Sequence, residues 1–144
     1  MTVIDLADAI AHFEVAHRRA RDLEHALLGL FAREIVSRAK HAIGTYEYAW
    51  APLAASTVAD RVAKGYSPDE PLLRSGELRD SIAWEYTGER SAIVGSNSDI
   101  AVWQELGTQH IPPRPFLEPS VAAAWPTVER VSAAMVAALF RPRF

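Results

Sequence analysis

The chain has 144 residues, of which 49% are hydrophobic and 23% charged; its formal net charge is −3 and it has no cysteine. This length suits one domain with its own core, and the composition excludes wholesale disorder, disulfides and thiolate metal sites. The acidic excess disfavours nucleic acid as the main ligand, because DNA-binding surfaces use basic residues to neutralise phosphates.

The sequence contains no run of 18 apolar residues, and residues 1–10 lack the basic start and apolar stretch of a secretory signal. A helix that spans a bilayer needs about 20 mostly apolar residues. We therefore expect neither a membrane-spanning helix nor a secretory signal.

Residues 4–42 are predicted to form one long helix that ends near Gly44. The lone Gly29 costs about 1 kcal/mol relative to alanine and does not end the pattern. At about 1.5 Å per residue the helix would be roughly 58 Å long, more than a compact domain of this size needs. It therefore either folds back on itself or packs against a neighbouring subunit. Its apolar stripe has three- and four-residue spacing and consists of Leu6, Ile10, Phe13, Ala16, Ala20, Leu23, Leu27, Leu30, Phe31 and Ile35.

The next segment contains a short helix between two loops. Trp50-Ala-Pro-Leu53 is predicted to be a rigid loop, and Thr57 with Asp60 resembles a weak capping box that starts a helix closed by Gly65. Residues 67–71 are rich in turn formers and predict a connector.

A β-hairpin is predicted after a second short turn. Ser75 is expected to cap a turn that runs through Leu78. Residues 82–86 then alternate large apolar with small or charged side chains, the pattern of a strand. Residues 87–90 predict a turn, and 92–94 a second strand that ends at Gly95 and pairs with the first.

Two further helices are expected. Residues 100–106 predict a short helix closed by Gly107, and three prolines exclude a helix over 111–115. The last helix is predicted over 119–140, with Pro119 as its first residue and a kink at Pro126. The predicted fold is α+β: a long N-terminal helix and a C-terminal helix packed on a small antiparallel sheet, in one domain spanning 1–144.

Patterns typical of catalysis or metal binding are absent from the sequence. His12 and His17 are five residues apart and do not share a helix face, and HExxH, GxSxG, Walker A and GxGxxG are missing. His110 is either a contact residue or an exposed loop histidine. We expect no catalytic residue, no metal site and no cofactor.

Residues 107–117, called the arm below, carry apolar side chains on a stiff, proline-rich segment. The arm is either a crossover whose Phe116 and Leu117 fill the local core, or an element preorganised to bind a partner. Gly107 is expected in a left-handed conformation. Arg114 offers a planar fork to a carboxylate or to carbonyl groups.

Five blocks in this order resemble the phage virion-morphogenesis and tail-completion families. They are Trp50-Ala-Pro-Leu53 with Ser56-Thr57, then the blocks at 72–82 (LLRSGELRDSI), 93–95 (IVG), 101–108 (AVWQELGT) and 111–117 (IPPRPFL). The resemblance covers about residues 50–120, in one α+β unit, and excludes the long N-terminal helix. Members often carry Tyr-Ala where this chain has Ile100-Ala101, so the subfamily stays open.

The resemblance implies a structural virion protein of the head–tail junction or upper tail, assembled in the bacterial cytoplasm. Its partners would be further copies in a ring, six-fold by expectation, and neighbouring neck, tail-terminator or tail-tube proteins. DNA would pass through as a non-specific cargo, with no membrane involved. The residues expected at interfaces or in structural roles are Trp50, Gly76, Leu78, Arg79, Gly107, Pro112, Arg114, Pro115, Phe116 and Leu117.

Three other functions are weighed beside this one. A tail-terminator or head-closure ring would share the small α+β fold and ring symmetry. A phage-encoded hydrolase or nuclease would need clustered carboxylates or a histidine-based site. A nucleic-acid-binding regulator conflicts with the charge balance.

Overall fold

The computed structural model describes residues 5–139, with the side chain of Leu139 excepted. The order of elements is α1 (Leu6–Ala42), α2 (Ala55–Ala63), α3 (Glu77–Ser81), β1 (Ile82–Gly88), β2 (Ser91–Ser96), α4 (Asp99–Leu106) and α5 (Leu117–Leu139). The α+β prediction is confirmed, with two long helices and a two-stranded antiparallel sheet. Residues 4 and 140, at the predicted ends of the long helices, lie outside the described part.

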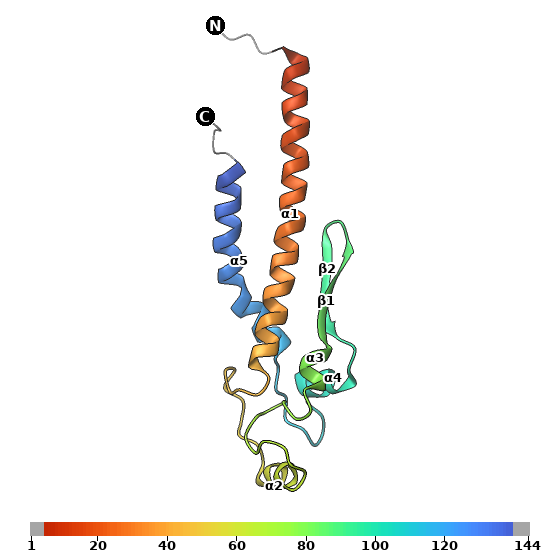
Figure 1. The fold of residues 1–144 in the computed structure, drawn as a ribbon, viewed down its shortest axis with the longest axis vertical. Coiled ribbons are helices and arrows are strands. Elements are labelled where there is room, and N and C mark those ends of the chain that lie inside the picture. The colour runs from red at the N-terminus through yellow and green to blue at the C-terminus, as the bar shows by residue number, and fades with distance from the viewer. Residues whose placement is uncertain (1–4, 140–144) are drawn as a thin grey trace.

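The molecule is elongated, because α1 is one uninterrupted helix of 37 residues. At 1.5 Å per residue its length is about 56 Å. Figure 1 shows the β-hairpin lying along the C-terminal half of α1 and α5 reaching farther toward its N-terminus, whereas α2, α3 and α4 gather at its C-terminal end. The predicted long helix therefore does not fold back on itself, and its first turns extend past the described end of α5.

The core lies at the C-terminal end of α1, where small side chains let other elements approach. Its buried members are Ala39, Ala42, Ile43, Trp50, Leu78, Ile82, Ala101 and Phe116. They come from five segments far apart in sequence, so this cluster joins α1, the Trp50 loop, α3 with β1, α4 and the arm. The blocks at 50–53, 72–82, 101–108 and 111–117 thus meet in one core.

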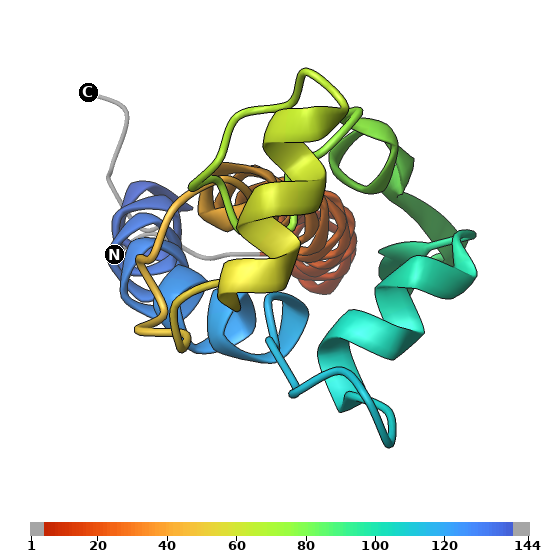
Figure 2. The same ribbon diagram turned by 90° about the horizontal axis from the view of Figure 1, so that it is seen from below.

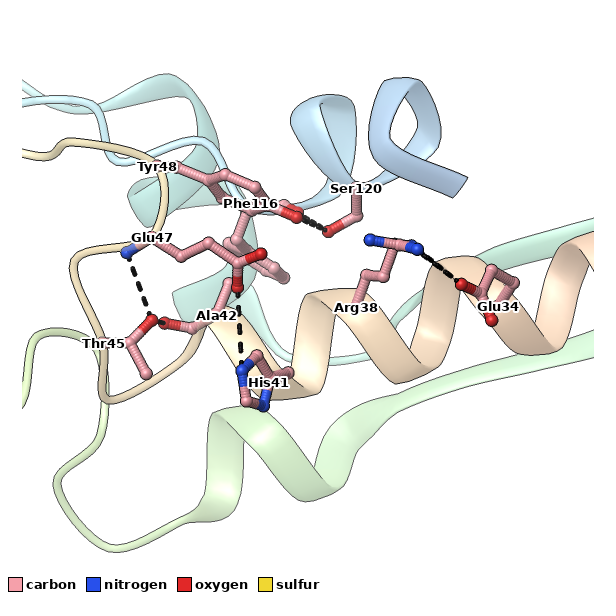
Figure 3. A network of polar contacts seen from close by, with 9 residues as sticks. All are labelled: Glu34, Arg38, His41, Ala42, Thr45, Glu47, Tyr48, Phe116 and Ser120. Atoms are coloured by element: carbon pink, nitrogen blue, oxygen red, sulfur yellow. Dashed lines mark hydrogen bonds and ion pairs between the residues drawn. The ribbon is translucent and has the colours of Figure 1, made fainter. Parts of the chain in front are cut away.

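The end of α1 matches the expectation for Gly44. Ala42 is the last helical residue, and Gly44 has φ +93° with its N–H donating to the Pro71 carbonyl at 2.8 Å. The Thr45 hydroxyl donates to the Ala42 carbonyl at 2.9 Å and accepts from the Glu47 N–H at 3.3 Å (Figure 3). These bonds turn the chain sharply away from α1 toward the Trp50 loop.

The hairpin forms as predicted and leans on α1. Trp84 pairs with Val94 in an antiparallel register, and the Tyr86 hydroxyl donates to the His25 carbonyl at 3.1 Å. At the tip, Arg21 is paired with Glu89 and Arg90 with Glu24, all four side chains being largely exposed.

Two predicted helix starts are wrong, those of α2 and α5. α2 begins at Ala55 with no side-chain cap, so Thr57 and Asp60 lie inside the helix and form no capping box. α3 spans Glu77–Ser81 with Gly76 at the N-cap position, and the hydroxyl of Ser75 before it accepts from the Glu77 N–H at 3.4 Å. α5 begins at Leu117, two residues before Pro119. Pro119 is tolerated in the first turn because backbone N–H groups there lack acceptors within the helix.

We predict that Gly29→Ala does not give the stabilisation that helix propensity alone implies, about 1 kcal/mol. An added Cβ would lie 2.2 Å from the Tyr86 hydroxyl oxygen, so the ring must leave its stacked position on His25. In a Tyr86→Ala background the same change should raise the free energy of unfolding. Urea denaturation of the four proteins of this double-mutant cycle measures the coupling. Equal effects in both backgrounds would contradict the prediction.

Candidate functional site

The arm and α4 form one closed unit at the compact end of the molecule. The Arg114 N–H donates to the Gln104 carbonyl at 2.6 Å, and the Thr108 N–H donates to the Ile111 carbonyl at 2.8 Å. The Trp50 indole N–H donates to the Pro115 carbonyl at 3.0 Å. The arm is therefore tied at both ends and to the Trp50 loop.

Gly107 is required by conformation and by space. Its φ is +75° and its ψ is 176°, so φ is positive as predicted, but the residue is not in the left-handed helical region. This combination is essentially restricted to glycine. A Cβ would also lie 2.9 Å from the Ile111 carbonyl oxygen and 2.9 Å from the Pro113 nitrogen. The proline segment packs so closely on the helix end that no side chain fits between them.

Glu105 of α4 caps the N-terminus of α5. One carboxylate oxygen accepts from the N–H groups of Phe116 and Leu117 at 2.8 and 3.0 Å, and the other accepts from Glu118 at 2.9 Å. The first N–H groups of a helix have no acceptor within it, and negative charge there is favoured by the helix dipole. The capping carboxylate thus comes from another helix, across the arm.

Sequence reasoning missed this role of Glu105, although a signal for it existed. Phe116 precedes the first helical residue and has no side-chain oxygen that could accept a hydrogen bond. A helix start without a Ser, Thr, Asp or Asn before it needs its acceptor from elsewhere.

Phe116 is the buried anchor of the arm. Its side chain is fully buried in the core cluster, and its carbonyl accepts from the Ser120 hydroxyl at 2.5 Å. The Ser120 and Tyr48 hydroxyl oxygens are 2.8 Å apart, which brings the loop after α1 to the same place (Figure 3). Phe116 therefore fills its own chain's core, as the crossover interpretation expects, and Leu117 packs against that cluster half-buried.

Arg114 also points into its own chain. The residue is 8% exposed, and one terminal guanidinium N–H donates to the Ala51 carbonyl at 3.3 Å. Its Nε is buried without a hydrogen-bond partner among the described residues. The guanidinium of Arg114 thus binds a carbonyl group of the Trp50 loop. A substitution at Arg114 would therefore disturb the fold as well as any contact with a partner.

The remaining predicted residues divide between core and surface. Leu78 is buried in the core cluster, and Gly76 has φ +92° at the start of α3. Arg79 has an exposed side chain 3.8 Å from Asp80. Pro112 is exposed and Pro115 half-buried. The structure brings together Trp50, Leu78, Arg114, Pro115, Phe116 and Leu117, and leaves Arg79 and Pro112 at the surface.

A cavity of about 570 Å³ lies between α2, the turn before α3, α4 and the arm. Arg61, missed by sequence reasoning, forms part of its wall. The side chain is buried and donates to the Ser67 carbonyl at 2.6 Å, the Glu70 carbonyl at 3.0 Å and the Leu73 carbonyl. Arg61 thereby holds the connector after α2 in shape, which is a structural role.

One carboxyl near this cavity has a shifted pKa. Asp60 accepts a hydrogen bond from Lys64, and with Arg74 beside it these cations lower the pKa of the Asp60 carboxyl. Asp60 and Arg74 join α2 to the turn before α3 by a surface ion pair. Such exposed pairs contribute little to stability.

The exposed surface of α4 is mostly apolar. Trp103 and Leu106 are 48% and 75% exposed, and Ile100 and Val102 are exposed beside them. Only Ala101 of this eight-residue helix is buried. Figure 2 shows α4 at the periphery of the compact end. Four exposed apolar side chains thus lie together on one short helix.

Residues 5–139 contain neither a group of side chains suited to bind a metal ion nor a helix suited to span a membrane. No group of three or more histidine, aspartate or glutamate side chains is placed to hold a metal ion. No helix in this part combines the length and the apolar character needed to cross a membrane. The His12 ring nitrogen bonds to the Asp8 carbonyl at 2.7 Å, one turn earlier on the same helix.

We predict that Glu105→Ala lowers the free energy of unfolding of the isolated protein by about 1–3 kcal/mol, because three N–H groups lose their acceptor. Glu105→Gln should cost less, since its amide oxygen still accepts. Urea denaturation measures both, with Glu85→Gln on the exposed face of β1 as the control. A Glu105→Ala protein as stable as the control would contradict the capping role.

We predict that Phe116→Ala destabilises the isolated protein by about 3–5 kcal/mol, the range for truncation of a buried phenylalanine. Trp103→Ala removes another aromatic ring from the same end of the molecule, but an exposed one, and should leave the melting temperature nearly unchanged. Thermal unfolding followed by circular dichroism compares the two. Similar shifts for both variants would show that the burial of Phe116 is not what stabilises this end.

Comparisons with protein-family models, with curated proteins and with solved structures found no match to this chain.

Proposed function

We propose that the chain is a structural protein of a tailed phage or prophage-like particle, which assembles as a six-fold ring at the head–tail junction. The exposed apolar face of α4 carries this proposal, because four apolar side chains in contact with water favour burial against another protein. The placement in a phage particle rests on the resemblance of residues 50–120 to tail-completion proteins.

The packing of the resembling blocks supports the proposal. Trp50, Leu78 and Phe116 come from three of these blocks and lie in one hydrophobic cluster. A set of short motifs that meets in one core behaves as one structural unit. Glu105 caps α5 and Gly107 lets the arm pack on the end of α4, so residues of these blocks stabilise the fold. The apolar side chains of α4 remain exposed.

Ring assembly needs two different surfaces on each copy. In a cyclic ring one patch docks on a different patch of the next copy. The face of α4 with Trp103 and Leu106 supplies one, and the first part of α5, where Val121 and Trp125 are exposed, supplies another. The net charge of −3 suits a channel through which DNA slides without binding tightly.

In this proposal the chain acts without catalysis or cofactor. Tail-terminator and head-closure rings would use the same kind of surface, and the position of the ring in the particle separates them. A reconstruction of the particle by electron microscopy, with the chain located by its long α1 helix, tests the position. A ring on the end of the tail tube would assign the chain to the tail terminators. A ring on the portal would assign it to the head-closure proteins.

We predict that the double variant Trp103→Ser with Leu106→Ser keeps the isolated fold and produces heads and tails that fail to join. Removal of the apolar side chains weakens the interface without touching the core. Electron micrographs of lysates count joined particles, and Val62→Ser on α2, an equally exposed apolar position, is the control. Normal numbers of infectious particles from the double variant would overturn the role of α4.

A further inference from the structure

The N-terminal half of α1 carries an apolar stripe that nothing within residues 5–139 covers. Leu6 and Phe13 are 74% and 77% exposed, and Ile10 is 51% exposed. Figure 1 shows the first turns of this helix standing beyond the described end of α5 and beyond the hairpin. A solvent-exposed helix without a partner would carry polar residues around its whole circumference, so this pattern points to a partner.

The spacing of the stripe is that of a helix that pairs with another helix. Apolar residues alternate three- and four-residue steps over three heptads, which is the repeat of coiled coils, at Leu6, Ala9, Phe13, Ala16, Ala20, Leu23, Leu27 and Leu30. The last three are partly covered, whereas Leu6, Phe13, Ala16 and Ala20 are exposed.

The covered part of the stripe packs against α5. Phe31 meets Trp125 edge to face at 5.9 Å, and Arg38 donates to Thr127 at 3.4 Å, so α5 lies against this face. α5 runs antiparallel to α1 and its described part ends at Leu139, partway along α1 (Figure 1). A helix that continued the track of α5 along the stripe would also run antiparallel to α1.

We propose that this helix is the N-terminal half of α1 from a second copy of the chain, packed antiparallel in a two-fold pair. With residues 6–23 overlapping, Leu6 faces the partner's Leu23, Ala9 faces the partner's Ala20, and Phe13 faces the partner's Ala16. Large side chains thus oppose small ones at the centre, as close packing requires.

The charges of the helix favour the same direction. Acidic side chains lie at its start, Asp5 and Asp8, and basic ones follow about one and a half heptads later, at Arg18, Arg19 and Arg21. In the antiparallel register Asp8 of each helix faces the partner's Arg21, twice, whereas Asp5 faces the partner's Glu24. A parallel pair in register would set like charges together, and the helix dipoles also favour the antiparallel pair.

This pair is distinct from the proposed ring. A two-fold contact uses the same patch on both copies and closes with two, so it cannot propagate around a cyclic ring. The pair therefore describes the free protein: it buries the α1 stripe before assembly and leaves the face of α4 available. The inference rests on the exposed stripe and stands without the proposed function.

Analytical ultracentrifugation of the full chain tests the pairing. We expect a reversible dimer, and Ala16→Glu should weaken its association about tenfold or more, since a carboxylate would be desolvated against the partner's stripe. Ala11→Glu is the matched control, because Ala11 is exposed on the opposite face of the same helix. A monomer at every concentration, or equal effects of both variants, would overturn the proposal.

The direction is tested by cross-linking, which the absence of native cysteine makes simple. Under mild oxidation, Ala9→Cys protein mixed with Ala20→Cys protein should form a disulfide-linked dimer, and neither protein should do so alone. Linked dimers from Ala9→Cys alone would establish a parallel pair and overturn the antiparallel arrangement. A monomeric free protein that still forms a ring in the particle would reject the pair and leave the proposed function in place.

Discussion

The carboxylate of Glu105 joins the end of α4 to the start of α5. It accepts from the N–H groups of Phe116, Leu117 and Glu118, and so it fixes the first turn of α5 against the last turn of α4. Because α5 begins there, the direction in which it leaves the core and runs along α1 follows from this contact. The arm between the two helices then has to close within ten residues, which is why a glycine and three prolines form it.

The same end of the molecule contains nearly all of the buried side chains. The core is assembled from small residues of α1 and from Trp50, Leu78, Ile82 and Phe116. Residues that resemble the motifs of tail-completion proteins are used to build it. These residues therefore build the core, whereas most of the exposed large apolar side chains lie on α1, α4 and α5.

Sequence patterns predicted the elements well and their ends less well. The helix of α1, the hairpin and the helix closed by Gly107 follow from periodicity and from glycine, which act within a few residues of the chain. The starts of α2 and α5 were misplaced, because Ala55 begins a helix without any cap and Leu117 receives its cap from a residue twelve positions earlier. Neither fact is visible in local sequence.

The candidate site shows the same division. Phe116 and Leu78 were recognisable as apolar anchors, but whether Phe116 entered its own core or a neighbour's depended on tertiary packing. Arg114 was expected to bind a carboxylate or carbonyl groups, but only the folded chain shows that its acceptor is the Ala51 carbonyl of the same molecule. Arg61 escaped notice because a lone arginine on a short helix has no pattern; only the folded connector supplies its three carbonyl acceptors.

The hairpin is expected to be less stable against local opening at its tip than at the end that joins the core. At the compact end, the strands join a core that excludes water, whereas at the tip they are tied to α1 by the exposed pairs of Arg21 with Glu89 and Arg90 with Glu24. Such pairs are screened by salt and hold little free energy. Amide hydrogens near the tip are therefore expected to exchange through local opening, and those around Ile82 only when the whole domain unfolds.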